Sequence, residues 1–274
     1  CKNNKVIENI INNILPKANS FIFESVEKRR YRGRYTIIGA DPDKIWELDK
    51  NKIYLIKNKK KKKIKGTPHI FLEKLIENFN FPLPKNLPPI SSLLAGYFSY
   101  DIIRYIEKIP DKCIDDLKIP DVKLSRPRNL VIYDSLKKKI YYIENIYSDT
   151  KIKNYSETYN NVLDKFSLFE NYENIKLPEK FTFKDNKNLI KSNTSKNKFK
   201  LLVQKAKEYI KTGDIFQVVL SQRFERKIEK KPIEIYNYLR KSNPSPFMFY
   251  FNYDDFKILG SSPEILVRLR KNEV

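Results

Sequence analysis

The fold of this chain is predicted outward from Asn243-Pro244-Ser245-Pro246-Phe247-Met248-Phe249-Tyr250-Phe251, which begins as a turn and continues as an apolar run. Its two prolines fix φ and remove two backbone donors, so they exclude a helix here. The short polar side chains of Asn243 and Ser245 are typical of turns. The stretch therefore predicts a rigid corner that leads into a buried strand. The same corner could also form a flat apolar wall for a ligand.

The composition is that of a folded protein with a large positive charge. Of its 274 residues 41% are hydrophobic, which is enough to build the core of one large domain or two ordinary ones. A net charge of +22 favours anionic partners such as nucleic acid or a polyanionic substrate. The excess is mostly lysine spread along the whole chain, so a compositional bias explains it equally well. A basic RNA-associated module is therefore a distant alternative.

Few cysteines and histidines limit the chemistry that this chain can carry. Cys1 and Cys113 form neither a disulfide framework nor a metal-ligand cluster, which favours a reducing, cytoplasmic setting. The single histidine, His69, is expected at a helix start rather than in a metal site or a catalytic pair. No apolar run approaches the ~20 residues of a membrane span. The chain lacks an initiating Met and ends just after an apolar stretch, so we expect a fragment of a longer protein.

Apolar periodicity predicts helices interposed among antiparallel strands. Helices are expected over 5–14, 69–76, 99–106, 155–169, 196–211 and 232–240, the fifth capped by Ser195 and ended by Gly213. Strands are expected over 21–23, 35–39, 45–48, 52–56, 128–133, 139–146, 214–224, 247–251, 256–259 and 264–269. The stretch 93–97 is small, apolar and aromatic, and its Gly96 allows close backbone approach. The lysine run 59–63 is expected at a solvated hairpin tip. The pattern predicts an α+β fold with antiparallel sheets and flanking helices.

A polar stretch rich in Asn and Lys divides the chain. Residues 148–193 are predicted to link a domain of residues 1–147 to the start of a second domain at 194–274.

Three polar positions next to apolar strands are candidates for a site. Gln217 lies within the predicted strand 214–224, and an inward amide without a partner would cost about 1–3 kcal/mol, so it needs a hydrogen bond or a ligand. An outward Gln217 is equally consistent with the sequence. Glu24-Ser25 could offer a carboxylate and a hydroxyl to a ligand amine, or could cap a strand end. Glu264 follows a tight turn and is expected to be solvated.

Taken together these stretches resemble the anthranilate synthase component I family, the large subunit of that enzyme. Its N-terminal signature is similar to Phe23-Glu24-Ser25-Val26-Glu27 followed by residues 33–42. Its chorismate-binding domain is similar to residues 213–224, 243–250 and 262–264, in that order. Four ordered motifs over most of the chain make the resemblance specific.

The resemblance implies a scaffold of two intertwined subdomains, incomplete here, and a lyase of tryptophan biosynthesis. Such enzymes add ammonia to the ring of chorismate, displace the 4-hydroxyl and eliminate pyruvate to give anthranilate. A separate glutamine amidotransferase subunit supplies the ammonia, and Mg²⁺ acts as a Lewis acid. The resemblance also implies that the Mg²⁺ ligands, the chorismate contacts and the acid/base histidine follow Val274. We therefore expect the fragment alone to be inactive.

The resemblance further implies an allosteric pocket for L-tryptophan made of Glu24, Ser25, Pro246, Phe247 and Met248. A flat apolar wall suits an indole, and a methionine sulfur makes favourable contacts with aromatic rings. A carboxylate suits an ammonium group. Feedback inhibition would then act by selecting one arrangement of the two units that the pocket joins.

Gln217 stands where similar water-adding enzymes, such as isochorismate synthases, carry a lysine that activates water. The resemblance therefore marks Gln217 as an active-site neighbour in an enzyme that uses ammonia. Aminodeoxychorismate synthase component I, of the folate pathway, is the nearest alternative, because the residues that separate the two are expected after Val274. Neither nucleic acid nor a membrane is an expected partner.

Overall fold

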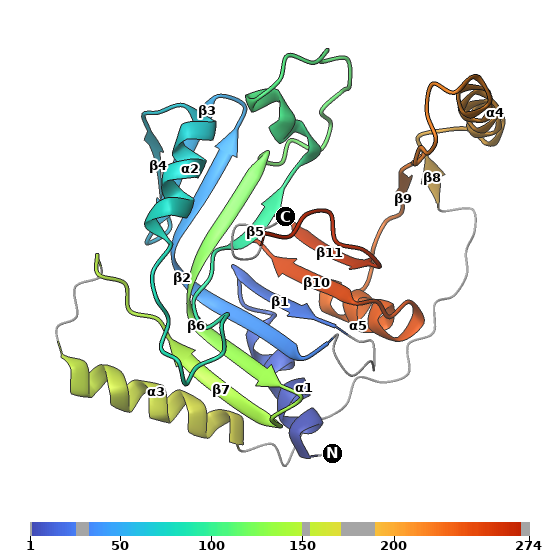
Figure 1. The fold of residues 1–274 in the computed structure, drawn as a ribbon. Coiled ribbons are helices and arrows are strands. Elements are labelled where there is room, and N and C mark those ends of the chain that lie inside the picture. The colour runs from blue at the N-terminus through green and yellow to red at the C-terminus, as the bar shows by residue number, and fades with distance from the viewer. Residues whose placement is uncertain (1, 26–32, 150–153, 171–189, 270–274) are drawn as a thin grey trace. The chain divides into compact units, whose positions relative to one another are not determined.

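The computed structural model describes residues 2–25, 33–149, 154–170 and 190–269 (Figure 1). The chain divides into two compact units. The first is formed by Cys1–Leu177 together with Ile235–Val274, and the second by Pro178–Glu234. None of the described helices is both long enough and apolar enough to cross a membrane.

One antiparallel sheet forms the body of the first unit. Its strands are β1 (Ser20–Glu24), β2 (Tyr35–Asp49), β3 (Lys52–Lys57), β4 (Lys60–Ile64), β5 (Ala95–Phe98), β6 (Val122–Asp134), β7 (Lys139–Glu144), β10 (Phe247–Asn252) and β11 (Lys257–Ser262). Their order is β11-β10-β1-β2-β3-β4, and β6 pairs with β2, β5 and β7. The long strands β2 and β6 form the spine of the sheet (Figure 1). This architecture confirms the predicted antiparallel α+β class.

Helices flank this sheet. They are α1 (Lys2–Ile14), α2 (Pro68–Asn78), the 3₁₀ helix η1 (Tyr100–Tyr105), α3 (Tyr155–Glu170) and α5 (Pro232–Ser242). Tyr250 and Asn252 of β10 contact α5 and the end of α1, since the Tyr250 and Tyr236 rings lie 5.6 Å apart and Asn252 donates to the carbonyl of Leu15 at 2.8 Å. In Figure 1, α1 and α5 accordingly lie behind β1 and β10.

The strand predicted at 247–251 joins the two ends of the first unit. As β10 it pairs antiparallel with β1, with Ser20 opposite Asn252 and Glu24 opposite Met248. Strands β10 and β11 therefore join the sheet that the N-terminal strands begin. The predicted domain boundaries at 147 and 194 stay a prediction.

Alternation along the strands produces two apolar clusters. One contains Phe21, Ala95, Leu130, Ile132, Phe251 and Tyr253. The other contains Trp46, Leu48, Ile53, Leu72 of α2, Val122 and Leu124. Fully burying such an apolar side chain contributes about 1.5–3 kcal/mol, so these clusters hold the sheet together.

Two predicted boundaries near the spine were wrong. The strand that starts at Tyr35 does not end at Gly39 but continues to Asp49, with a register shift between Pro42 and Lys44. A proline lacks a backbone donor, and a bulge lets the strand pass it without breaking. The lysine run is solvated and lies on a hairpin as predicted, but only Lys59 is in the turn itself. Residues 60–64 form β4, and the turn before it is Asn58-Lys59, both with positive φ.

Near the C-terminal end one predicted strand was wrong, and the strand predicted at 256–259 continues further than expected. Residues 264–269 are not a strand, and residues 260–262, predicted as a turn, complete β11. Gly260 lies opposite Phe249, and a Cβ at this position would come within 2.3 Å of the Phe249 ring. The small residue that suggested a turn instead makes room for an aromatic side chain within the sheet.

The second unit contains α4 (Lys196–Thr212) and a short ladder of β8 (Lys191–Ser192) with β9 (Phe224–Glu225). The predicted cap and stop of the helix are confirmed: Ser195 Oγ accepts from the Lys198 amide, and Gly213 has φ 81°. The predicted strand 214–224 is wrong, because within the described chain only Phe224 of this stretch is in a ladder. Phe216 is 94% exposed, so its apolar side chain has no sheet to pack against here.

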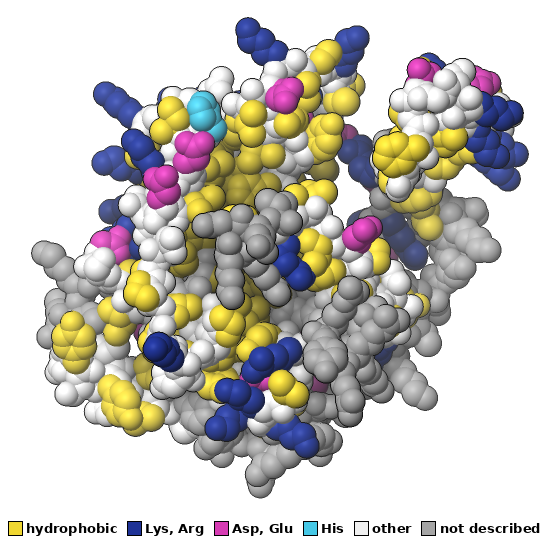
Figure 2. Space-filling model, viewed as in Figure 1, with side chains coloured by type: hydrophobic (Ala, Val, Ile, Leu, Met, Phe, Trp, Pro, Cys, Tyr) yellow, Lys and Arg dark blue, Asp and Glu magenta, His cyan; other side chains and the backbone are white. Residues whose placement is uncertain are grey.

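The positive charge is dispersed over the surface. Figure 2 shows Lys and Arg side chains scattered over the visible face of the first unit, among hydrophobic and neutral side chains. This distribution agrees with the interpretation of the charge as a compositional bias.

Candidate functional site

The end of β1 lies beside the start of β10. The register sets Glu24 opposite Met248 and Phe23 opposite Phe249. Pro246 is buried directly before β10, and Ser25 follows directly after β1. The structure therefore brings together the two sequence stretches that were predicted to share a site.

Glu24 is buried and faces the helices. The phenol of Tyr236 in α5 donates to Glu24 Oε1 at 2.5 Å, and Arg240 Nη2 donates to Glu24 Oε2 at 2.9 Å. Arg240 also donates from Nη1 to Glu8 of α1 at 3.2 Å. Both oxygens of Glu24 are thus hydrogen-bonded by α5, and Arg240 connects that helix to α1.

Burial and charge keep this cluster in one protonation pattern. Burial, together with the nearby Glu24 carboxylate, raises the pKa of Tyr236 well above its ordinary value, so the phenol stays a donor. Burial alone would lower the pKa of Arg240, but the charges of Glu24 and Glu8 outweigh it and raise that pKa. The guanidinium therefore stays charged between its carboxylates.

The corner before β10 is held by its own side chains. Ser245 Oγ donates to the sulfur of Met248 at 3.3 Å, and Met248 is 1% exposed. Ser261 of β11 donates to the carbonyl of Asn243 at 2.6 Å. These contacts make the corner the rigid turn that its prolines predicted.

The opposite face of the same strands carries aromatic side chains. Because side chains alternate along a strand, Phe23, Phe247 and Phe249 lie away from Glu24. All three are half-buried. The five predicted pocket residues therefore come close together where β1 and β10 pair, but those within the strands divide between two faces.

Ser25 carries a buried polar atom without a partner among the described residues. Leaving a buried hydroxyl unpaired costs about 1–3 kcal/mol. A ligand group at this point would satisfy it. Ser25 is therefore the position of this site where the geometry best accommodates a polar contact from outside the protein.

Gln217 lies in the second unit, outside any strand, and is exposed. An inward and an outward Gln217 were both consistent with the sequence, and the exposed side chain agrees with the outward alternative, although the predicted strand around it does not form. Its assignment as an active-site neighbour stays a prediction.

Sequence reasoning missed Tyr236 and Arg240. Both lie on the predicted helix 232–240, four positions apart, and such a pair shares one face. A buried carboxylate needs donors. The combination of a Glu at the end of an apolar strand with a Tyr/Arg pair at this spacing was the available signal.

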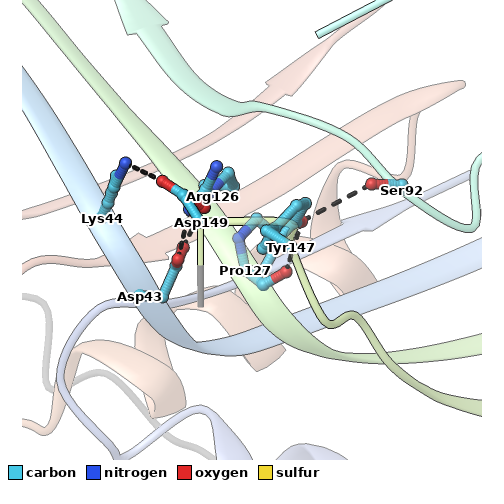
Figure 3. Close-up of polar contacts among 7 residues, drawn as sticks. All are labelled: Asp43, Lys44, Ser92, Arg126, Pro127, Tyr147 and Asp149. Carbon is cyan, nitrogen blue, oxygen red and sulfur yellow. Dashed lines mark hydrogen bonds and ion pairs between the residues drawn. The ribbon is translucent and has the colours of Figure 1, made fainter. Parts of the chain in front are cut away.

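A second polar cluster, centred on the buried Arg126, lies at the register shift of β2 (Figure 3). Arg126 of β6 donates from Nε to Asp43 at 2.8 Å and from Nη2 to Asp149 at 2.9 Å. Its guanidinium lies 3.9 Å from the centroid of the Tyr147 ring, and Lys44 also binds Asp149. Because these charges are paired with one another, we assign the cluster to anchoring the segment after β7 on the spine.

Metal ligands do not gather in the described part of the chain. No group of three or more His, Cys, Asp or Glu side chains there could hold a metal ion. Asp43 and Asp149, the acidic pair of the second cluster, are both held by Arg126. These residues do not fit a magnesium site.

Comparison with known proteins now identifies the family. Residues 19–274 match the family described as chorismate binding enzyme. The chain belongs to this family. The sequence resemblance to anthranilate synthase component I is thereby confirmed at the level of the fold and the family.

Several curated relatives are named as a component or subunit of anthranilate synthase. The chain is 35% identical to "Anthranilate synthase component 1" of Cereibacter sphaeroides over 94% of its own length and 53% of the relative. It is also 35% identical to the protein of that name from Acetivibrio thermocellus, over 93% of the chain and 52% of the relative. The chain thus spans about half the length of these relatives.

A solved structure agrees with this assignment. The crystal structure of anthranilate synthase component I from Streptococcus pneumoniae superposes with a TM-score of 0.67 at 27% identity, over 89% of this chain and 53% of that one.

Proposed function

We propose that this chain is part of an anthranilate synthase component I, a lyase that makes anthranilate from chorismate in tryptophan biosynthesis. The observation that carries the proposal is 35% identity, over 94% of the chain, to a relative with that name. The fold supports it, because the similar solved structure carries the same name. The relatives are about twice as long, so the proposal concerns a protein that contains this chain.

The proposed reaction has two stages. The nitrogen of ammonia forms a bond to the ring of chorismate while the 4-hydroxyl leaves as water. The ring carbon that carries the new nitrogen then loses its proton as the bond from the ring to the enolpyruvyl oxygen breaks, so the ring becomes aromatic. The leaving enolpyruvate takes up a proton at its methylene carbon and is released as pyruvate. Mg²⁺ would supply Lewis-acid chemistry when bound. The contribution proposed for the described residues is regulatory rather than chemical.

We place a tryptophan effector site where β1 ends beside β10. The unpartnered Ser25 hydroxyl, the buried Pro246 and the half-buried Phe247 support this placement. An indole would pack on the proline and the aromatic ring, and a polar group of the amino acid would satisfy Ser25. Binding there would inhibit by favouring one arrangement of the two units.

The proposed partner is a glutamine amidotransferase subunit, which would supply ammonia within a complex. The proposed setting is the cytoplasm. The exposed free thiol of Cys113 suits a reducing compartment.

A product assay tests the proposal. The chain, extended to the length of its curated relatives, is incubated with chorismate, ammonium and Mg²⁺, and the product is identified by fluorescence and mass. We expect anthranilate with pyruvate in equal amounts, and no turnover by the 274-residue chain alone. Formation of 4-amino-4-deoxychorismate would contradict the proposal in favour of the folate-pathway enzyme. Tight, salt-dependent RNA binding without turnover would favour the basic RNA-associated module.

A further inference from the structure

We propose that Glu24 does not bind the effector, and that Arg240 is a positioning residue that holds the end of β1 in place through Glu24. This inference rests on the proposed tryptophan site at Ser25 and Pro246. It assigns different roles to two neighbouring residues that the sequence had grouped together.

The first step is the occupancy of Glu24. Its side chain is 5% exposed, and its two oxygens accept hydrogen bonds from Tyr236 and Arg240. An ammonium group that reached this carboxylate would have to displace a guanidinium from a desolvated ion pair. Charge-assisted hydrogen bonds of this kind are roughly twice as strong as neutral ones. The hydrogen-bonding capacity of Glu24 is therefore already used by side chains of the protein itself.

The second step concerns the contacts that α5 makes with β1, α1 and β10. Its Arg240 binds Glu24 of β1 and Glu8 of α1, while its Tyr236 ring lies 5.6 Å from the Tyr250 ring of β10. One helix thus touches both strands whose ends form the candidate site. The helix α5 therefore holds both the strand that precedes Ser25 and the strand that follows Pro246.

The third step is the place of α5 in the chain. The helix begins at Pro232, within the residues of the second unit, and ends at Ser242 within the first. The corner of Pro244 and Pro246 follows directly. Arg240 therefore holds on β1 the helix that leads directly into this corner.

Two ligands separate positioning from direct contact. L-Tryptophan carries an ammonium group, and indole-3-propionate carries the same indole and carboxylate without it. If Glu24 positions β1, Glu24→Gln weakens both ligands by the same factor, about tenfold. If Glu24 binds the ammonium, Glu24→Gln weakens tryptophan alone. Calorimetric titration of the purified protein gives both dissociation constants and the binding stoichiometry.

Variants of α5 test the anchor itself. Arg240→Gln should raise the dissociation constant of tryptophan about tenfold at unchanged stoichiometry, and Arg240→Lys should recover part of it. Tyr236→Phe, which removes a single hydrogen bond, should give a smaller rise. The KM for chorismate should not change in the extended enzyme. The matched control is Arg126→Gln, which breaks a buried ion pair of the same sheet and should leave tryptophan binding unchanged.

The outcomes separate this inference from the proposed function. A wild-type protein that binds no tryptophan overturns the effector site and the positioning role together, whereas the product assay decides the lyase function independently. Normal binding by the wild type, loss of binding in Ser25→Phe and unchanged binding in the Arg240 and Tyr236 variants overturns only the positioning role. If Arg240→Gln does not fold, the comparison of the two ligands in Glu24→Gln and the Tyr236→Phe variant decide the matter.

Discussion

At the scale of single residues, Ser25 differs from its neighbour Glu24 in having no described partner for a buried polar atom. We predict that Ser25→Phe, in the chain extended to the length of its relatives, abolishes tryptophan inhibition and leaves chorismate turnover largely intact. The larger ring would fill the space in which the effector has to lie. Initial rates of anthranilate formation at increasing tryptophan concentration measure this.

The control for that variant is Ser156→Phe, at an exposed position of α3. It should be inhibited like the wild type. Pro246→Ala should also relieve inhibition, because it removes the rigid apolar wall beside β1. Unchanged inhibition in both site variants would contradict the effector site. Residues 243–246 would then be only a turn that leads into a core strand.

Asp149 provides a prediction for pH dependence. The hydrogen bond from Lys44, supported by Arg126, lowers the pKa of Asp149 from 3.8 to about 2. Its folded pKa lies below the unfolded one, so its stabilising contribution is complete above 3.8 and is lost as the pH falls through about 2. Asp149→Asn should therefore lower the free energy of unfolding at neutral pH.

The same variant should lose less stability than the wild type between about pH 4 and pH 2. Urea unfolding at several pH values measures both effects. Asp164→Asn, at an exposed position of α3, is the control and should follow the wild type throughout. If the free energy of unfolding of Asp149→Asn depended on pH in the same way as that of the wild type, the ion pair would add nothing to stability.

The site residues were predictable from the sequence only in part. Glu24 and Met248 were placed in one site by the motif resemblance, and their cross-strand register bears out that proximity. The partner of Glu24 was not found, because nothing local to Arg240 says which carboxylate it meets. Burial of both groups arises from the packing of α5 on the sheet, and that packing is a tertiary property.

At the scale of elements, two cross-strand pairs set an aromatic ring over a glycine. Phe21 lies opposite Gly39, and Phe249 lies opposite Gly260. A Cβ at Gly39 would come within 2.2 Å of the Phe21 ring, and one at Gly260 within 2.3 Å of the Phe249 ring. These glycines serve close packing within the sheet rather than turns.

We predict that Gly260→Ala destabilises the protein by about 1–3 kcal/mol, because overpacking forces the ring out of its position. Urea denaturation gives the change in the free energy of unfolding. Ser262→Ala, at the end of the same strand, is the matched control and should cost less. If the two substitutions cost the same, the ring moves aside without strain.

The elements themselves were predicted well where local signals decide them. The Ser195 cap and the Gly213 stop depend only on neighbouring backbone groups, and α4 has both. The strand expected at 214–224 failed for the opposite reason. High β propensity describes a segment that fits a sheet, but a ladder needs a second strand to pair with. In the described chain no ladder includes residues 214–223.

At the scale of the whole molecule, strands from both ends of the described chain belong to one sheet. Strands β10 and β11 complete the sheet that α1 and β1 begin, so the first unit is built from both ends of the sequence. Composition and periodicity placed the strands of 247–262 in the right class. They could not show that β10 pairs with β1, because the pattern of a strand does not specify which other strand it pairs with. Only the motif resemblance connected the two stretches.

The lysines of β4 bear on how copies of this protein behave toward one another. As the last strand of the order, β4 offers unpaired backbone groups along Lys60–Ile64. A second molecule that added a strand here would bring two rows of ammonium groups to within about 5 Å, and like charges at that distance repel. Lys60→Gln with Lys62→Gln should therefore promote aggregation, and the wild type should aggregate more as salt screens the repulsion. Light scattering across a salt series measures this. Equal scattering from the wild type and the double variant would show that the lysines of β4 do not protect against aggregation.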